Sequence, residues 1–161
     1  MDVGRTEVYA AERVAFDGTD LEEVVPFDTL TAAIADVVDG AWWPGPPVTV
    51  RAARSDARSS SARCACAEGA GVTISVARPQ CTAATAAHEL AHALAGVAAG
   101  HGQRFRRAHL DVVSVITNRS PITRRGDLHV AQLREAYNAA GLTIGSRSWP
   151  APPDTDTSFA L

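Results

Sequence analysis

Long apolar runs are missing from this sequence. No hydrophobic stretch of the kind that forms the core of a signal peptide follows residues 1–5, and the most apolar segment, residues 81–100, is interrupted by His88, Glu89 and His92. A helix that crosses a membrane needs about 20 predominantly apolar residues. We therefore expect no membrane span, no membrane partner and a cytoplasmic location.

Cysteine is also scarce. Cys64, Cys66 and Cys81 cannot all pair within one chain, and without an export signal we expect reduced thiols. Only one residue separates Cys64 from Cys66, whereas paired cysteines in structural zinc sites are usually separated by two or more. We therefore do not expect a metal site at this pair.

Neither sign of charge predominates strongly, and the formal net charge is −3. This balance gives no general reason to expect nucleic acid as a partner. The 161 residues contain no long low-complexity tract, and 46% are apolar and 20% charged, which is typical of one globular domain. We predict a single domain over residues 1–147, followed by a proline-rich, disordered tail over residues 148–161.

Alternation of apolar and polar residues marks the predicted strands. Residues 48–52 alternate with the two-residue period of a half-buried strand. Residues 62–67 and 71–78 flank a short connection with two glycines and predict a β-hairpin, while the run 54–63, rich in Ser and Arg, is expected to form a loop. We expect residues 72–77 to offer an exposed strand edge to an extended peptide.

Apolar residues at helical spacing mark the predicted helices. Asp28 is a possible N-cap of the first helix, and Thr82 or Thr85 of the second. Residues 7–16 fit neither the helical nor the strand period, so their structure stays open. The helices are predicted over residues 29–40, from Thr82 or Thr85 to about residue 98, and over residues 102–116 and 128–140.

The chemistry of the sequence is concentrated in His88-Glu89-Leu90-Ala91-His92. On a helix, residues four apart share one face, so His88 and His92 can direct imidazole nitrogens at one ion about 2 Å away. Glu89 lies beside that face, where a carboxylate suits a general base that takes a proton from water activated by zinc. The pattern therefore predicts one catalytic Zn²⁺ per chain.

A catalytic zinc takes three protein ligands and leaves a fourth position open. His101 is the predicted third ligand, because Gly96 and Gly100 allow the chain to turn and return its side chain to the helix. His109 and Asp111 are the competing candidates for the third ligand. For both we favour another interpretation, as ordinary helix residues or as side chains that contact the ligands.

The metzincin class is excluded, because its motif needs Gly at position 95 and His at position 98, where this sequence has Ala95 and Ala98. His129 and Tyr137 could each donate to a transition-state oxyanion, although a surface histidine and a core tyrosine are the favoured interpretations. An arginine-rich region begins near residue 104 and continues to residue 125. We interpret it as a solvated face rather than a nucleic-acid site.

Two segments carry a resemblance to known enzymes. His88–His92 followed by His101-Gly102-Gln103-Arg104-Phe105 resembles the active-site region of SprT-like and WLM-type zinc metalloproteases, over about 25 residues. The whole chain, with Val8-Tyr9-Ala10-Ala11-Glu12 near its start, resembles small metallohydrolases of actinobacteria and their phages. The 161 residues contain neither the paired-cysteine zinc ribbon nor the DNA-binding region that SprT-like enzymes often carry.

The resemblance implies an α+β, zincin-like fold of the minigluzincin type, with His88, His92 and His101 as zinc ligands and Glu89 as catalytic acid and base. The expected fold has a small twisted sheet with helices packed on it and the metal in a cleft under the sheet's edge. The expected activity is a zinc-dependent metallopeptidase acting on a peptide or protein substrate. The alternatives are a catalytically silent, zinc-stabilised binding module and a DNA-associated regulator.

Overall fold

The structure is a computed structural model that describes residues 2, 4–64, 71–119 and 126–153. These residues form five α-helices and three strands, so the α+β class is confirmed. The helices are α1 (Arg5–Phe16), α2 (Phe27–Val38), α3 (Ala83–Ala95), α4 (Gln103–Arg119) and α5 (Gly126–Ala139), and the strands are β1 (Val48–Ala52), β2 (Ser61–Cys64) and β3 (Val72–Val76).

The three strands form one mixed sheet in the order β1-β3-β2. β3 pairs parallel with β1 and antiparallel with β2, in a register that sets Val48 opposite Val72 and Ser61 opposite Ser75. The antiparallel pairing of β2 with β3 agrees with the predicted hairpin, whose connection, residues 65–70, lies outside the described residues. The prediction of an exposed edge over residues 72–77 is wrong, because β3 is the central strand and is paired on both sides.

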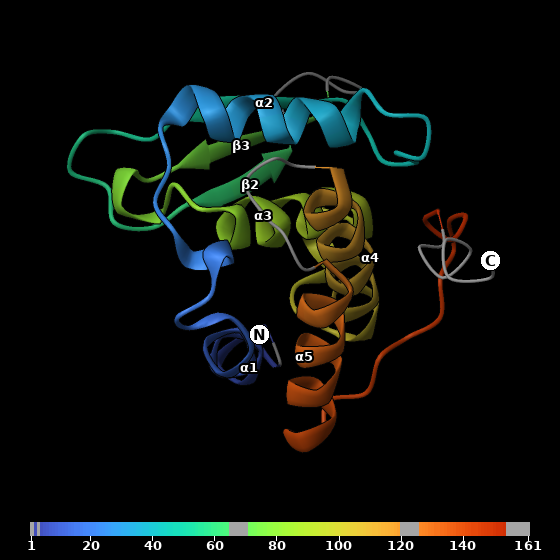
Figure 1. The fold of residues 1–161 in the computed structure, drawn as a ribbon. Helices are drawn as coiled ribbons and strands as arrows, with labels where there is room; N and C mark the ends of the chain where they lie inside the picture. Colours follow the sequence, from blue (N-terminus) through green and yellow to red (C-terminus); the bar gives the residue numbers. More distant parts are fainter. Residues whose placement is uncertain (1, 3, 65–70, 120–125, 154–161) are drawn as a thin grey trace, which may run out of the picture.

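The helices surround one apolar core. In Figure 1 the sheet lies between α2 at the top and α3 below it, while α4 and α5 run down one side as a pair and α1 lies at the bottom. All five helices and β3 contribute to a single buried apolar cluster, with Ile74 of β3 and Leu90 of α3 fully buried. The sides of α3 that do not face the sheet contact α4 and the N-terminal part of the chain.

Several predicted boundaries change. Residues 7–16, left open from the sequence, belong to helix α1. The helix predicted from residue 29 starts at Phe27 after Pro26, so Asp28 lies in its first turn and is not the N-cap. Within the predicted loop 54–63, residues 61–63 belong to β2.

The turn after α3 returns the chain to the helix that it has just left. Gly96 ends α3 with a φ of 98°, before the predicted end near residue 98, and Gly100 adopts a φ of 60°. These values favour glycine, because a side chain in this region is strained. At Gly100 a Cβ atom would also approach the carboxylate of Asp2 to 2.7 Å. The turn places His101 directly before α4.

The segment after α5 packs against α4, so the predicted disorder from residue 148 is wrong for its first residues. Asp111 of α4 accepts hydrogen bonds from Arg147, at 2.7 and 2.9 Å, and from the indole of Trp149, at 2.9 Å. The Trp42 indole donates to the carbonyl of Pro150. Residues 154–161 of the predicted tail lie outside the described part of the chain.

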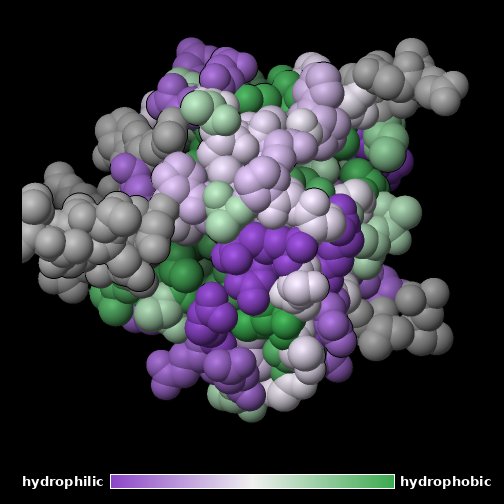
Figure 2. All heavy atoms as spheres, turned by 90° about the vertical axis from the view of Figure 1, so that its right-hand side faces the viewer, coloured by the Kyte–Doolittle hydropathy of each residue, from purple (hydrophilic) through white to green (hydrophobic). Residues whose placement is uncertain are grey.

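Arginines of the predicted basic face hold this same segment. Arg106 and Arg107 donate to the carbonyls of Thr143 and Gly145, and Arg104 donates to Ser148. Figure 2 shows the side of the molecule on which the segment lies, with a hydrophilic area near the centre and smaller hydrophobic areas around it. Part of the hydrogen-bonding capacity of these guanidinium groups is therefore used within the chain.

The described cysteines are free, Cys64 exposed and Cys81 buried. Cys66 lies outside the described residues, so the absence of disulfides stays a prediction. Among the described helices, none is both long enough and apolar enough to cross a membrane.

Candidate metal centre

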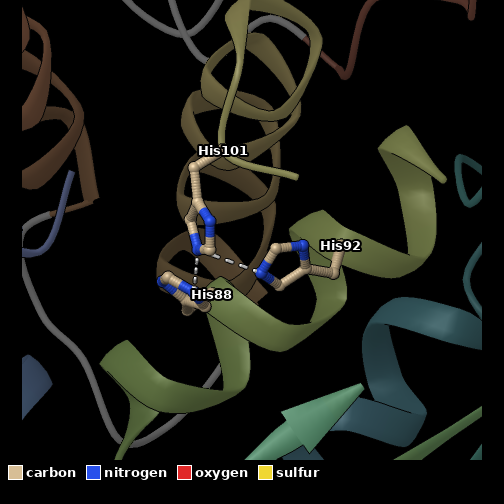
Figure 3. Close-up of side chains that lie close together, drawn as sticks. All are labelled: His88, His92 and His101. Atoms are coloured by element: carbon tan, nitrogen blue, oxygen red, sulfur yellow. Dashed lines mark hydrogen bonds between the residues drawn. The ribbon is translucent and has the colours of Figure 1, made fainter. Parts of the chain in front are cut away.

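Three histidines meet beside α3. His88 and His92 lie one turn apart on the helix, and His101 reaches them from the turn before α4, as Figure 3 shows. The Nε2 atom of His101 lies 3.1 Å from Nε2 of His88 and 3.2 Å from Nε2 of His92. His88 and His101 are buried, and His92 is half-buried. The structure thus brings together the three side chains that the sequence predicted as ligands.

Two carboxylates fix which nitrogen of His88 and of His101 carries the proton. His88 Nδ1 lies 2.6 Å from Glu12 Oε1, and His101 Nδ1 lies 2.6 Å from Asp2 Oδ2. An ionised carboxylate only accepts hydrogen bonds, so both Nδ1 atoms donate. In the neutral rings the Nε2 lone pairs then face each other across 3.1 Å. The two lone pairs repel each other unless a cation or a proton lies between them.

Two groups in the described residues could hold a metal ion: His88 with His92 and His101, and His88 with Glu12 and His109. Two ligand atoms about 2.1 Å from one tetrahedral zinc lie about 3.4 Å apart. The Nε2 separations of 3.1 and 3.2 Å in the first group are close to this value. In the second group, 2.6 Å between His88 Nδ1 and Glu12 Oε1 is a hydrogen-bond distance. The first group is therefore the better metal site.

The electrostatics keep two of these three imidazoles neutral. Burial, followed by the positive charges of His88 and His101, lowers the pKa of His92 to about 3. Burial also lowers the pKa of His101 despite the hydrogen bond with Asp2. For His88, burial is the largest influence and lowers the pKa, but the charge and hydrogen bond of Glu12 outweigh it and raise the pKa. Neutral imidazole is the form that binds metal.

Glu89 lines a cleft of about 470 Å³. Its side chain is buried, yet it makes no hydrogen bond or ion pair with any described residue. Burial is the main cause that raises the pKa of Glu89 to about 7, and the charge of Glu12 adds to it while His88 opposes it. A carboxyl group with a pKa near neutrality can both take and return a proton at neutral pH.

The cleft lies between α1 and the region around the sheet's β2 edge. One wall comes from α1, and the other comes from the residues before β2 and between β3 and α3. The lining residues are mostly polar, in keeping with a site for a hydrated substrate, and comprise Arg5, Tyr9, Glu12, Arg13, Glu22, Ser59, Ser60, Pro79, Gln80, Thr82, Ala84, Thr85, His88 and Glu89.

Tyr9 covers the metal centre from the α1 side. Its ring stacks on His88, with centroids 5.1 Å apart and planes 10° from parallel, and lies at a tilt 5.5 Å from the ring of His101. Burial, followed by the charge of Glu89, raises the pKa of Tyr9. The phenol therefore stays protonated at neutral pH, beside the histidines and near Glu89.

His109 and Asp111, the competing third ligands, lie apart from the three Nε2 atoms. His109 is fully buried, with Nδ1 2.5 Å from the Tyr137 hydroxyl and Nε2 3.2 Å from Glu12 Oε1. Asp111 is occupied by Arg147 and Trp149. His109 thus contacts Glu12, which is the hydrogen-bond partner of the predicted ligand His88. This agrees with the interpretation of His109 as a partner of the ligands.

The two residues that the sequence offered as less favoured oxyanion donors do not line the cleft. His129 of α5 lies 2.8 Å from Asp20, and the rings of His129 and His109 each contact Phe16 edge-on. His129 is buried, so its interpretation as a surface histidine is wrong. Tyr137 is fully buried beside His109. Neither residue lines the cleft, so this pair of hypotheses is wrong in the geometry described here.

Sequence reasoning missed Asp2, Tyr9 and Glu12. Tyr9 and Glu12 are three apart, so they share a face once residues 5–16 are recognised as helical. Its buried face comprises Val8, Ala11, Ala15 and Phe16, a helical spacing that was not recognised in the sequence because two of the four are alanines. Asp2 had no signal, because its partner His101 is 99 positions away.

Comparison of the chain with protein-family models, with curated proteins and with solved structures gives no match.

Proposed function

We propose that this protein is a zinc-dependent hydrolase, most specifically a metallopeptidase of zincin-like, minigluzincin type. The observation that carries the proposal is the convergence of three Nε2 atoms, two of them on imidazoles oriented by carboxylates, beside a cleft that His88 and Glu89 line. Three imidazoles with one position left open are a common ligand set of catalytic zinc. The SprT-like resemblance of the motif agrees with this proposal.

The metal would be held by His88, His92 and His101, and zinc in such a site supplies Lewis acidity that makes water acidic near pH 7. Glu89 takes the proton of the attacking water and passes it to the amine nitrogen as the C–N bond breaks. Glu12 and Asp2 keep His88 and His101 in the tautomer that presents Nε2. The products are a carboxylate and an amine.

A peptide is the proposed substrate because the cleft adjoins the start of an edge strand. β2 pairs only with β3 among the described strands, and the residues just before it, Ser59 and Ser60, line the cleft. An extended peptide can add to such an edge through backbone hydrogen bonds. The proposed docking strand is thus β2, in place of residues 72–77.

Glu89→Gln tests the proposal, because the change is nearly isosteric and removes no ligand. We expect the variant to keep its zinc and to lose hydrolysis by roughly 10²–10⁴-fold, the usual contribution of a positioned proton acceptor. The assay is cleavage of a peptide library, with zinc measured on the same sample. Glu7→Gln, the same change at an exposed position of α1 outside the cleft, is the matched control and should hydrolyse like the wild type.

Full zinc with near-wild-type turnover in Glu89→Gln would refute the role of Glu89. Zinc in the wild type without turnover of any library peptide would favour the zinc-stabilised binding module instead. Retention of zinc by His101→Ala would show that the third ligand is wrong.

A further inference from the structure

Hydrolysis of an amide needs a donor for the negative charge that develops on the carbonyl oxygen, and the residues assigned so far do not include one. A single donor aimed at this oxygen contributes about 10²–10³-fold to kcat in other enzymes. His129 and Tyr137 lie away from the cleft. The donor must therefore be sought among the polar side chains that line it.

Several of those side chains make hydrogen bonds that stabilise the fold. Thr82 accepts from the backbone N–H of Thr85 at the start of α3, and Ser60 Oγ accepts from the N–H of Ala77. The Gln80 side chain accepts from the N–H of Ser60. None of these residues makes a ring contact with a histidine of the metal centre in the described part of the chain.

Tyr9 differs from them in its contact with the metal centre. Its ring lies almost parallel to that of His88 and contacts that of His101 at a tilt, so two of the three histidines fix its position. It is 37% exposed and lines the same cleft as Glu89. A phenol is a neutral hydrogen-bond donor at neutral pH. The ring is thus held by packing while the side chain remains open to the cleft.

We propose that Tyr9 is a catalytic residue that donates its O–H hydrogen bond to the oxyanion formed from the substrate's peptide carbonyl. This inference rests on the proposed function. As the oxygen of water bonds to the carbonyl carbon, the π electrons of C=O move to its oxygen, and Glu89 holds the proton taken from the water. When the C–N bond breaks, the oxygen's electron pair re-forms C=O and Glu89 protonates the departing nitrogen. The Tyr9 proton stays on Tyr9 throughout.

Arg5 supports Tyr9 and is also the competing donor. Its guanidinium carbon lies 5.8 Å from the centre of the Tyr9 ring, and the two side chains share a hydrogen bond. Arg5 lies one turn before Tyr9 on α1 and lines the cleft. Arg5 makes no ring contact with the histidines in the described residues, so we assign it to positioning the Tyr9 phenol.

The test is Tyr9→Phe, which removes only the hydroxyl and keeps the ring on His88. We expect unchanged zinc content, a KM within about threefold of the wild type and a kcat lower by about 10²–10³-fold. Thr6→Val removes an exposed hydroxyl of the same helix and should leave kcat unchanged. A kcat within threefold of the wild type, or a loss of zinc in Tyr9→Phe, would overturn the proposal.

A second measurement does not need turnover. An Ala-Ala phosphinic pseudopeptide carries a tetrahedral PO₂⁻ group in place of the scissile amide, and calorimetry gives its Kd for the zinc-loaded protein. We expect Tyr9→Phe to weaken this Kd at least tenfold, while Arg5→Gln weakens it less. Equal affinity in the wild type and Tyr9→Phe, no binding to the wild type, or a larger effect of Arg5→Gln would each overturn the role of Tyr9. Absence of turnover in the wild type, with this tenfold difference intact, would refute the peptidase and keep the oxyanion donor.

Discussion

At the scale of single residues, the three histidines differ in what lies behind them. His88 is backed by Glu12, which in turn contacts His109, and His109 contacts the buried hydroxyl of Tyr137. His101 is backed by Asp2. His92 Nδ1 is buried and has no hydrogen-bond partner in the described residues. A buried N–H without an acceptor costs about 1–3 kcal/mol, so this position is explained by metal binding better than by folding stability.

Glu12→Gln should weaken zinc binding without unfolding the protein. The neutral amide is a poorer acceptor for His88 Nδ1–H than the carboxylate, and loss of such an orienting partner typically costs 10–100-fold in metal affinity. Competition with a chromophoric chelator measures the change. Glu7→Gln, at an exposed position of the same helix, is the control, and an equal affinity in both variants would show that Glu12 does not orient the ligand.

At the scale of elements, α3 combines the strongest local signals in the chain. Thr82 caps it, with Oγ1 accepting from the N–H of Thr85 at 3.1 Å, and Gly96 ends it. Between them the buried face is made mostly of alanine and leucine, with Leu90 and Ala91 fully buried inside the motif. The helix that carries two of the ligands and Glu89 is therefore defined by its own sequence.

Thr82→Ala should lower the free energy of unfolding of the zinc-free protein by about 1 kcal/mol, the usual contribution of an N-cap side chain. Urea denaturation followed by circular dichroism gives the value, and chelator is present so that zinc does not mask the change. Thr29→Ala, exposed in the first turn of α2, should have no destabilising effect. Equal losses in the two variants would contradict the role of the cap.

The presence or absence of such local signals explains which parts of the site could be predicted from the sequence. His88, Glu89 and His92 follow from local spacing, and His101 follows from the glycines around it. Tyr9 and Glu12 could not be placed, because they lie on α1 outside its buried apolar residues and meet α3 only in the folded chain. The central place of β3 was missed for the same reason, since its partner β1 is separated from it in the sequence by the whole of β2. Contacts that form only through tertiary packing leave little signal in the local sequence.

At the scale of the whole molecule, the buried histidines make stability depend on pH. Burial is the largest influence on both His92 and His109, and it lowers their pKa values from 6.5 to about 3 and about 4. As pH falls below about 6.5, the unfolded chain takes up protons that the folded chain does not, so stability falls. Glu89 acts in the opposite sense, because its pKa is raised from 4.5 to about 7 and the folded chain takes up its proton first.

We therefore expect the zinc-free protein to lose stability between about pH 6.5 and pH 4, and to lose it more steeply in Glu89→Gln, where the opposing titration is absent. The free energy of unfolding measured in urea at half-unit pH steps gives both slopes. Glu7→Gln, at an exposed position of α1, serves as the control. A shallower slope in Glu89→Gln than in the wild type would show that the sign assigned to Glu89 is wrong.

The orienting carboxylates also set the order in which the site can be completed during synthesis. Glu12 and His88 are 76 positions apart, and Asp2 and His101 are 99 apart. Contacts of such separation form late, because a long loop must close before they are gained. On a ribosome, α1 emerges long before any of the histidines, and the last ligand emerges only after all of α3. A nascent chain of the proposed hydrolase would thus have no complete ligand set until most of its fold was in place.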